Sequence, residues 1–186
     1  MFGPVELFSR VADRLTVTSL GPAAGPVASS QGAAVVADAA WADAGRPDIV
    51  LVPGGMGTRG LVSDDAFLAW LRDWAAGAAL VTSVCTGSGV LAAAGLLDGY
   101  RATSNKRAFA WASGQGTGVE WVAEARWVHD RDRWTSSGVA AGTDMAFALL
   151  ADLFGEAVAQ EAADGIELEV QRDPAHDRFA ALNGLV

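Results

Sequence analysis

The residue of this chain best suited to covalent chemistry is Cys85, its only cysteine. It follows the apolar, strand-like run 79–84 and precedes Thr86-Gly87-Ser88-Gly89, a small-residue stretch that opens a predicted helix. The positive end of a helix dipole favours a thiolate over a thiol, and the thiolate is the reactive species. A sharp strand-to-helix turn also needs small neighbours, which the glycines provide. The pattern predicts a nucleophile, with a buried small apolar side chain as the alternative.

A second candidate part of the site is the glycine pair Gly54-Gly55, which follows the apolar run 48–52 and Pro53. Ligands of parallel α/β sheets bind at the carboxyl ends of strands, where this pair and Cys85 are both expected to lie. Glycine permits close backbone approach, so the N–H groups of Gly55 and Thr86 are candidates for stabilising negative charge on a substrate. An ordinary turn is the alternative for the glycine pair.

The elements that must position these residues alternate between strands and helices. We expect strands over 15–20, 33–37, 48–52 and 79–84, and helices over 64–76, 85–96, 107–113, 142–154 and 155–163. The continuous apolar run 48–52 is typical of a central, buried parallel strand. Alternation of this kind predicts a three-layer α/β/α sandwich around a mostly parallel sheet.

The rest of the chain adds connections to this core. Residues 125–128 and 133–137 flank a short polar turn and predict an antiparallel hairpin. The Gly/Pro/Ser-rich stretch 21–32 is expected to be a loop, and the alternating residues 166–170 an exposed strand or arm. We expect a single domain over 1–186 with a flexible tail over 171–186.

Composition bounds the function. The 186 residues carry 13 Lys plus Arg against 22 Asp plus Glu, a formal net charge of −9, which disfavours binding to nucleic acid or anionic lipid. No secretory leader or membrane span is evident, so a cytoplasmic location is the expectation. One cysteine and two distant histidines lack the spacing of a metal site, and we expect neither a metal nor another cofactor.

Several segments together resemble the ThiJ/PfpI superfamily, which has the flavodoxin-like, class I glutamine amidotransferase-like fold and includes the parkinsonism-associated deglycase. They are Pro53-Gly54-Gly55, Ser83-Val84-Cys85-Thr86-Gly87-Ser88, Ala92-Ala93-Ala94-Gly95-Leu96-Leu97-Asp98-Gly99, Arg101-Ala102-Thr103 and Thr135-Ser136-Ser137-Gly138-Val139-Ala140-Ala141-Gly142-Thr143-Asp144-Met145. The match spans nearly the whole chain in the expected order.

Within that superfamily, cysteine followed by Thr-Gly-Ser is similar to the isonitrile hydratase branch and to the sensor domains of some AraC-type regulators. The protease-like branch carries histidine where this chain has Thr86, which disfavours a Cys-His protease. The resemblance implies a hydro-lyase in which the Cys85 thiolate attacks the terminal carbon of an isonitrile, and water then releases an N-substituted formamide. The Thr86 hydroxyl would orient substrate or water. The resemblance also implies a homodimer, which the Trp-rich segment 111–134 fits. For those tryptophans we expect core packing or a subunit interface, with a hydrophobic pocket wall as the alternative.

Two departures from the superfamily pattern concern acids and bases. The superfamily pattern Asp-x-x-Gly-Pro-x-Glu aligns with residues 1–6 so that its aspartate would fall one residue before Met1 and the usual first strand is missing. Glu6 is the one candidate acidic partner within the chain, with an exposed surface charge as its alternative. Asn105 takes the place of a histidine and cannot titrate. His129 and His176 are expected on the surface.

Two other functions share these residues. A ligand-sensing or redox-responsive domain without catalysis would use Cys85 as an oxidisable thiol. A glyoxalase or deglycase acting on α-oxo aldehydes would need the same thiolate and an acidic partner. In each case the expected ligand is a small molecule.

Overall fold

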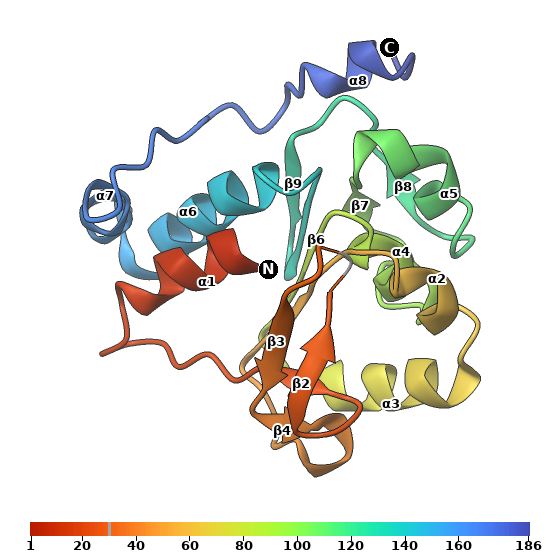
Figure 1. Ribbon diagram of the computed structural model, residues 1–186. Helices are drawn as coiled ribbons and strands as arrows, with labels where there is room; N and C mark the ends of the chain where they lie inside the picture. Colours follow the sequence, from red (N-terminus) through yellow and green to blue (C-terminus); the bar gives the residue numbers. More distant parts are fainter. Residues whose placement is uncertain (30) are drawn as a thin grey trace.

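The computed structural model describes residues 1–29 and 31–186 and has a mixed α/β architecture (Figure 1). Its central sheet contains, in spatial order, β5 (Ile49–Val52), β6 (Leu80–Val84), β10 (Arg133–Ser136) and β9 (Trp127–Asp130). The first three run parallel, whereas β9 is antiparallel to β10. The prediction of a mostly parallel sheet with an antiparallel hairpin is confirmed.

Helices cover both faces of this sheet. On one side lie α1 (Phe2–Ser9), α6 (Ala141–Phe154) and α7 (Glu156–Asp164), and on the other α3 (Asp65–Ala75) and α4 (Gly87–Ala93) (Figure 1). One apolar core joins Val84 of β6 to the first group of helices, and a second joins Val81 to the other group. Because side chains of a strand point alternately to its two faces, β6 contributes to both cores. The predicted three layers are therefore present.

Local sequence explains where the helices begin. The carboxylate of Asp64 accepts a hydrogen bond from the Phe67 N–H at 3.0 Å and caps α3, as expected for an acidic residue before an amphipathic run. α4 begins at Gly87, two residues later than predicted, because Cys85 and Thr86 form the turn before it. The helices predicted over 107–113, 142–154 and 155–163 are confirmed by α5 (Phe109–Ser113), preceded by a 3-10 turn over Lys106–Ala108, and by α6 and α7.

Short strand pairs complete the fold. β1 (Leu20–Gly21) is parallel to β4 (Ala39–Ala40), β2 (Gly25–Ala28) is antiparallel to β3 (Ala34–Ala37), and β7 (Arg101–Ala102) is parallel to β8 (Glu120–Trp121). A 3-10 turn over Trp41–Asp43 and the short helices α2 (Thr58–Leu61) and α8 (Phe179–Leu182) are the remaining elements.

Three local predictions are wrong. The strand expected over 15–20 is reduced to its last residue, in β1, and the loop expected over 21–32 contains β2, residue 30 of that loop lying outside the described part of the chain. Of the strand or arm expected over 166–170, the strand is absent and the chain leads instead into the C-terminal arm. β5 is not central: among the described residues it pairs with β6 alone, and Val50 is its one fully buried residue.

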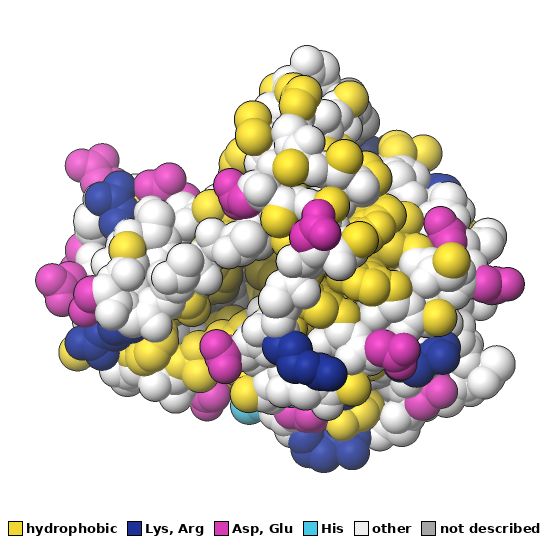
Figure 2. Space-filling view, turned by 90° about the horizontal axis from the view of Figure 1, so that it is seen from below, with side chains coloured by type: hydrophobic (Ala, Val, Ile, Leu, Met, Phe, Trp, Pro, Cys, Tyr) yellow, Lys and Arg dark blue, Asp and Glu magenta, His cyan; other side chains and the backbone are white. Residues whose placement is uncertain are grey.

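The molecule's lower face, seen in Figure 2, has a hollow around which apolar side chains gather.

The C-terminal part of the chain runs as an arm back across the molecule. Its backbone makes hydrogen bonds to the body, from Arg126 N–H to Pro174 O at 2.8 Å and from Asp177 N–H to Glu124 O at 2.7 Å. Trp127 and Trp134 are 6% and 3% exposed, so core packing is the role of these two tryptophans. Within the described residues, no helix has the length and apolarity needed to cross a bilayer.

Candidate functional site

The turn between β6 and α4 holds Cys85 in a backbone conformation that non-glycine residues rarely adopt. Its φ is +60°, in the left-handed region, and such strain persists only where the surroundings enforce it. Here the Cys85 N–H donates to the carbonyl oxygens of Ser136 at 3.1 Å and Ser137 at 3.0 Å, both at the carboxyl end of β10. The Cys85 carbonyl accepts from the hydroxyls of Ser88 at 3.1 Å and Ser104 at 3.0 Å. Both sides of the peptide are therefore fixed, and the thiol is half-buried rather than sealed in the core.

Glycines permit this turn to pack against the end of β5. A Cβ on Gly87 would overlap the carbonyl oxygen of Val52 and stand 2.9 Å from its carbonyl carbon. A Cβ on Gly54 would stand 2.7 Å from the Thr86 nitrogen and 2.8 Å from the Cys85 Cβ. The structure thus brings Gly54 and Cys85 into contact, as their places at neighbouring strand ends predict.

Beside the thiol, the hydroxyl of Thr86 is held by the glycine loop. Thr86 is 5% exposed, and its Oγ1 accepts a hydrogen bond from the Gly55 N–H at 3.0 Å. Gly55 has a φ of +138°, which explains why glycine is needed there. In this state the Gly55 N–H is already engaged, so of the two N–H groups considered for charge stabilisation, that of Thr86 is the better placed.

Thr58 is a residue of the site that the sequence analysis missed. It is 3% exposed, and its Oγ1 donates to the Gly55 carbonyl oxygen at 2.7 Å and lies 3.2 Å from Thr86 Oγ1. Arg59 Nη1 donates to the same Thr58 oxygen at 3.1 Å. The only sequence signal was a threonine three residues after the glycine pair, which is too common a pattern to single out.

The start of α1 reaches the same place. The Met1 amino group is coupled electrostatically to Cys85; burial lowers its pKa below the usual value, and the charge of Cys85 opposes that shift. The resemblance places an acidic partner next to this position. Glu6, the candidate inside the chain, is exposed and pairs with Arg10 at 3.0 Å, one turn further along α1. The alternative assigned to Glu6, a surface charge, fits this geometry.

Two of the other polar residues considered from the sequence, Asn105 and His129, have structural partners. The side chain of Asn105 accepts a hydrogen bond from the Ala108 N–H at 3.1 Å and so caps the 3-10 turn before α5. His129 is exposed, bonds to Arg131 O and stacks on Trp134. His176 is exposed on the arm. Across the described ranges, no group of three or more His, Cys, Asp or Glu side chains could hold a metal ion.

Next to the elbow, a cavity of about 400 Å³ is lined by Asn105, Lys106, Ser137 and apolar residues of α8. Lys106 is 3% exposed, and its ammonium donates to Ala125 O at 2.5 Å and Thr103 Oγ1 at 2.8 Å. Burial lowers the pKa of Lys106 to about 8, against the opposing effect of nearby carboxylates. This lysine ties the 3-10 turn to the segment before β9.

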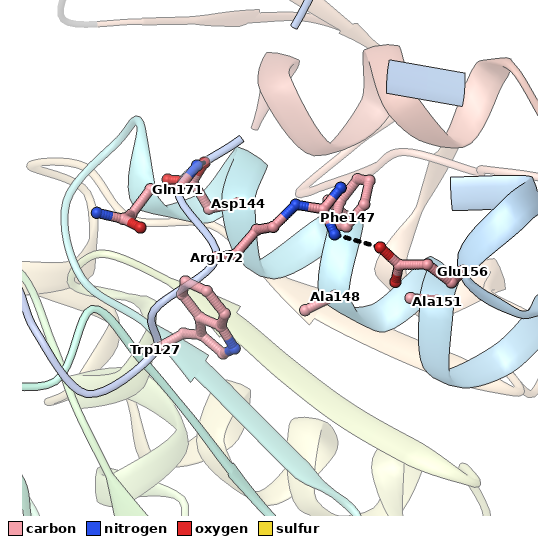
Figure 3. Close-up of a pocket in the computed structure, with 8 residues that line it drawn as sticks. All are labelled: Trp127, Asp144, Phe147, Ala148, Ala151, Glu156, Gln171 and Arg172. Atoms are coloured by element: carbon pink, nitrogen blue, oxygen red, sulfur yellow. Dashed lines mark hydrogen bonds and ion pairs between the residues drawn. The ribbon is translucent and has the colours of Figure 1, made fainter. Parts of the chain in front are cut away.

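A smaller cavity of about 190 Å³ lies under the arm (Figure 3). Arg172 crosses it, paired with Glu156 and lying over the Phe147 ring at 4.7 Å. Asp144 at its edge is 5% exposed and accepts from Arg126 Nε at 2.7 Å and from the Gln171 N–H at 3.0 Å. Asp144 therefore joins the start of α6 to Arg126, just before β9, and to the arm.

A cysteine held at positive φ between a parallel strand and a helix, beside a glycine loop from the neighbouring strand, defines an α/β protein with a nucleophile-elbow site. Comparison with known proteins makes this more specific. The model of the DJ-1/PfpI family matches residues 1–152, and the chain belongs to that family.

Two relatives share part of this sequence. The chain is 38% identical over 150 residues to the isonitrile hydratase of Pseudomonas putida, an alignment that covers 81% of this chain and 63% of that protein. It therefore spans less than two thirds of that relative's length. An uncharacterised protein in the cpoL 5' region of Streptomyces lividans is 41% identical over 108 residues, covering 55% of this chain and 75% of that protein.

Solved structures show the same fold. A ThiJ/PfpI family protein from Pseudomonas syringae matches with a TM-score of 0.79 and 34% identity over 100% of this chain and 79% of that one. Drosophila melanogaster DJ-1beta matches with a TM-score of 0.75 and 23% identity over 90% of each chain. The predicted ThiJ/PfpI membership and fold class are confirmed.

Proposed function

We propose that this protein is a cysteine-dependent hydro-lyase of the isonitrile hydratase type, acting on a small-molecule isonitrile. The observation that carries the proposal is the strained, half-buried Cys85, followed by Thr86 and packed on Gly54, in a chain related to an isonitrile hydratase. Backbone strain at a non-glycine residue concentrates at functional sites. A cysteine with only a packing role has no need of this conformation.

In the proposed reaction, the Cys85 sulfur attacks the terminal carbon of the isonitrile. The thiol proton moves to that carbon and leaves a thioimidate with an S–C bond. Water then adds across the C=N bond, its hydroxyl going to carbon and its proton to nitrogen. The C–S bond breaks as the hydroxyl proton returns to sulfur, and an N-substituted formamide is released. The sum is one isonitrile plus one water, with no redox change and no cofactor.

The residues around the thiol support specific roles in this sequence. The Thr86 N–H lies at the start of α4 and is proposed to face the negative charge that develops on the substrate. Gly54 leaves the space beside Cys85 and the Thr86 nitrogen that a side chain would fill. The charge of Cys85 acts on the Met1 amino group, and the acid and base that the reaction needs are proposed to act on this side of the thiol.

The test is formation of N-cyclohexylformamide from cyclohexyl isocyanide, followed by NMR. We compare the chain with Cys85→Ser and with a version extended at its N-terminus by a strand that ends in aspartate. Product from the extended protein but not from its Cys85→Ser variant is the expected result. Absence of product from both unsubstituted proteins would overturn the proposal. In that case, methylglyoxal turnover would indicate glyoxalase or deglycase chemistry, and Cys85 oxidation at low peroxide a redox-responsive domain.

A further inference from the structure

We propose that Thr58, polarised by Arg59, is a positioning residue of the Cys85 site that fixes the direction of the Thr86 hydroxyl proton. The effect on kcat predicted below rests on the proposed function, whereas the hydrogen-bond arrangement does not. The structural basis of the inference is the buried hydroxyl pair Thr58, in α2, and Thr86, in the turn before α4, whose oxygens are 3.2 Å apart. α2, which carries Thr58, lies beside α4 (Figure 1).

The hydrogen-bond roles in this network follow from what each group can do. An arginine guanidinium can only donate, so the 3.1 Å contact from Arg59 Nη1 occupies an acceptor position on Thr58 Oγ1. The single proton of Thr58 goes to the Gly55 carbonyl oxygen, which is the closer of its two partners at 2.7 Å. Thr86 must then donate the hydrogen bond that joins the two hydroxyls.

The Thr86 proton has two acceptors within reach, Thr58 Oγ1 at 3.2 Å and the Gly55 carbonyl oxygen at 3.4 Å, and the farther one already accepts from Thr58. Thr86 Oγ1 accepts from the Gly55 N–H at 3.0 Å, and its own proton points to Thr58, which has a second acceptor position. Toward a reacting molecule the Thr86 hydroxyl can therefore offer only a lone pair, which suits it to accept a hydrogen bond from water and so to orient it.

Arg59 is itself held in place. Its guanidinium lies over the Trp111 ring, 3.4 Å from the ring centroid, where the negative face of the ring attracts the cation. Trp111 in turn packs on Gly89 of α4, where a Cβ would stand 2.9 Å from the ring. A line of contacts thus runs from α5 through Arg59 and Thr58 to the elbow.

The variants that test this are Thr58→Val, which is close in shape but has no hydroxyl, and Thr58→Ser, which keeps the hydroxyl. The loss of one buried hydrogen bond that acts on the site predicts a fall in kcat for Thr58→Val of about tenfold with KM little changed. Thr58→Ser should stay within about twofold of the unsubstituted protein. A purely structural role would lower the stability of Thr58→Val without lowering kcat at unchanged KM.

Amide hydrogen exchange gives a second readout that needs no turnover. The Gly55 N–H should exchange about tenfold faster in Thr58→Val than in Thr58→Ser, because Thr86 is no longer held as its acceptor. Equal kcat in Thr58→Val and the unsubstituted protein, or equal losses in the two variants, would overturn the inference. If neither the unsubstituted protein nor its N-terminally extended version makes formamide, the proposed function fails; equal Gly55 exchange in the two variants would overturn the positioning role independently.

Discussion

The packing of the elbow makes a quantitative prediction about Gly87→Ala. The new Cβ would overlap Val52 O and approach the carbonyl carbons of Val52 and Pro53 at 2.9 and 3.1 Å. These are backbone atoms at the end of β5, so relief requires moving a strand rather than turning a side chain. We therefore expect a cost at the upper end of the range for overpacking, about 3 kcal/mol of unfolding free energy.

Gly60→Ala is the matched control. Gly60 lies in α2 and a Cβ there would meet nothing within 4 Å, so helix propensity alone should leave stability unchanged or raise it by up to about 1 kcal/mol. Urea unfolding followed by tryptophan fluorescence measures both variants. With a slope of about 2 kcal/mol per molar, Gly87→Ala should lower the midpoint by about 1.5 M. A midpoint within about 0.3 M of the unsubstituted protein would refute the described contact between the elbow and β5.

Three further predictions concern the site and its surroundings. Gly54→Ala should reduce isonitrile turnover at least tenfold, since its Cβ crowds Cys85; unchanged kcat/KM would remove Gly54 from the site. Arg126→Met should cost about 3 kcal/mol in urea unfolding by leaving Asp144 buried without its charge partner, whereas a loss below about 1 kcal/mol would contradict the buried pair. Because the folded-state pKa of Lys106 is lowered to about 8, the unfolded chain binds more protons between pH 8 and 10.5, and stability should rise with pH across that window. Lys106→Met should lose this rise, worth up to about 3 kcal/mol, and an identical pH dependence in the two proteins would show that the ammonium is not buried.

The sequence predicted the main elements because their patterns are strong. The apolar run before Cys85 is typical of a buried strand, and the spacing of apolar residues in α3 is typical of an amphipathic helix. The alternation of strands and helices then leaves few arrangements of the sheet. The contact between Gly54 and Cys85 followed from a general rule, that neighbouring parallel strands end at the same edge.

What sequence reasoning missed depends on partners distant in the chain. The run 48–52 has the composition of a central strand, but whether a strand is central depends on its neighbours, and β5 has one among the described residues. β2 is a strand through pairing with β3, despite its glycine and proline. Thr58 belongs to the site because α2 places its hydroxyl against Thr86, which no local pattern encodes.

The most direct test of the central claim is to identify the atom that bonds to the isonitrile. The N-terminally extended protein is mixed with cyclohexyl isocyanide, quenched with acid within the first turnover, digested and mapped by mass spectrometry. We predict an added mass of one isonitrile on the peptide that contains Cys85, and none on the same peptide from Cys85→Ser. Formamide release at an undiminished rate by Cys85→Ser, or an adduct confined to another residue, would contradict the account.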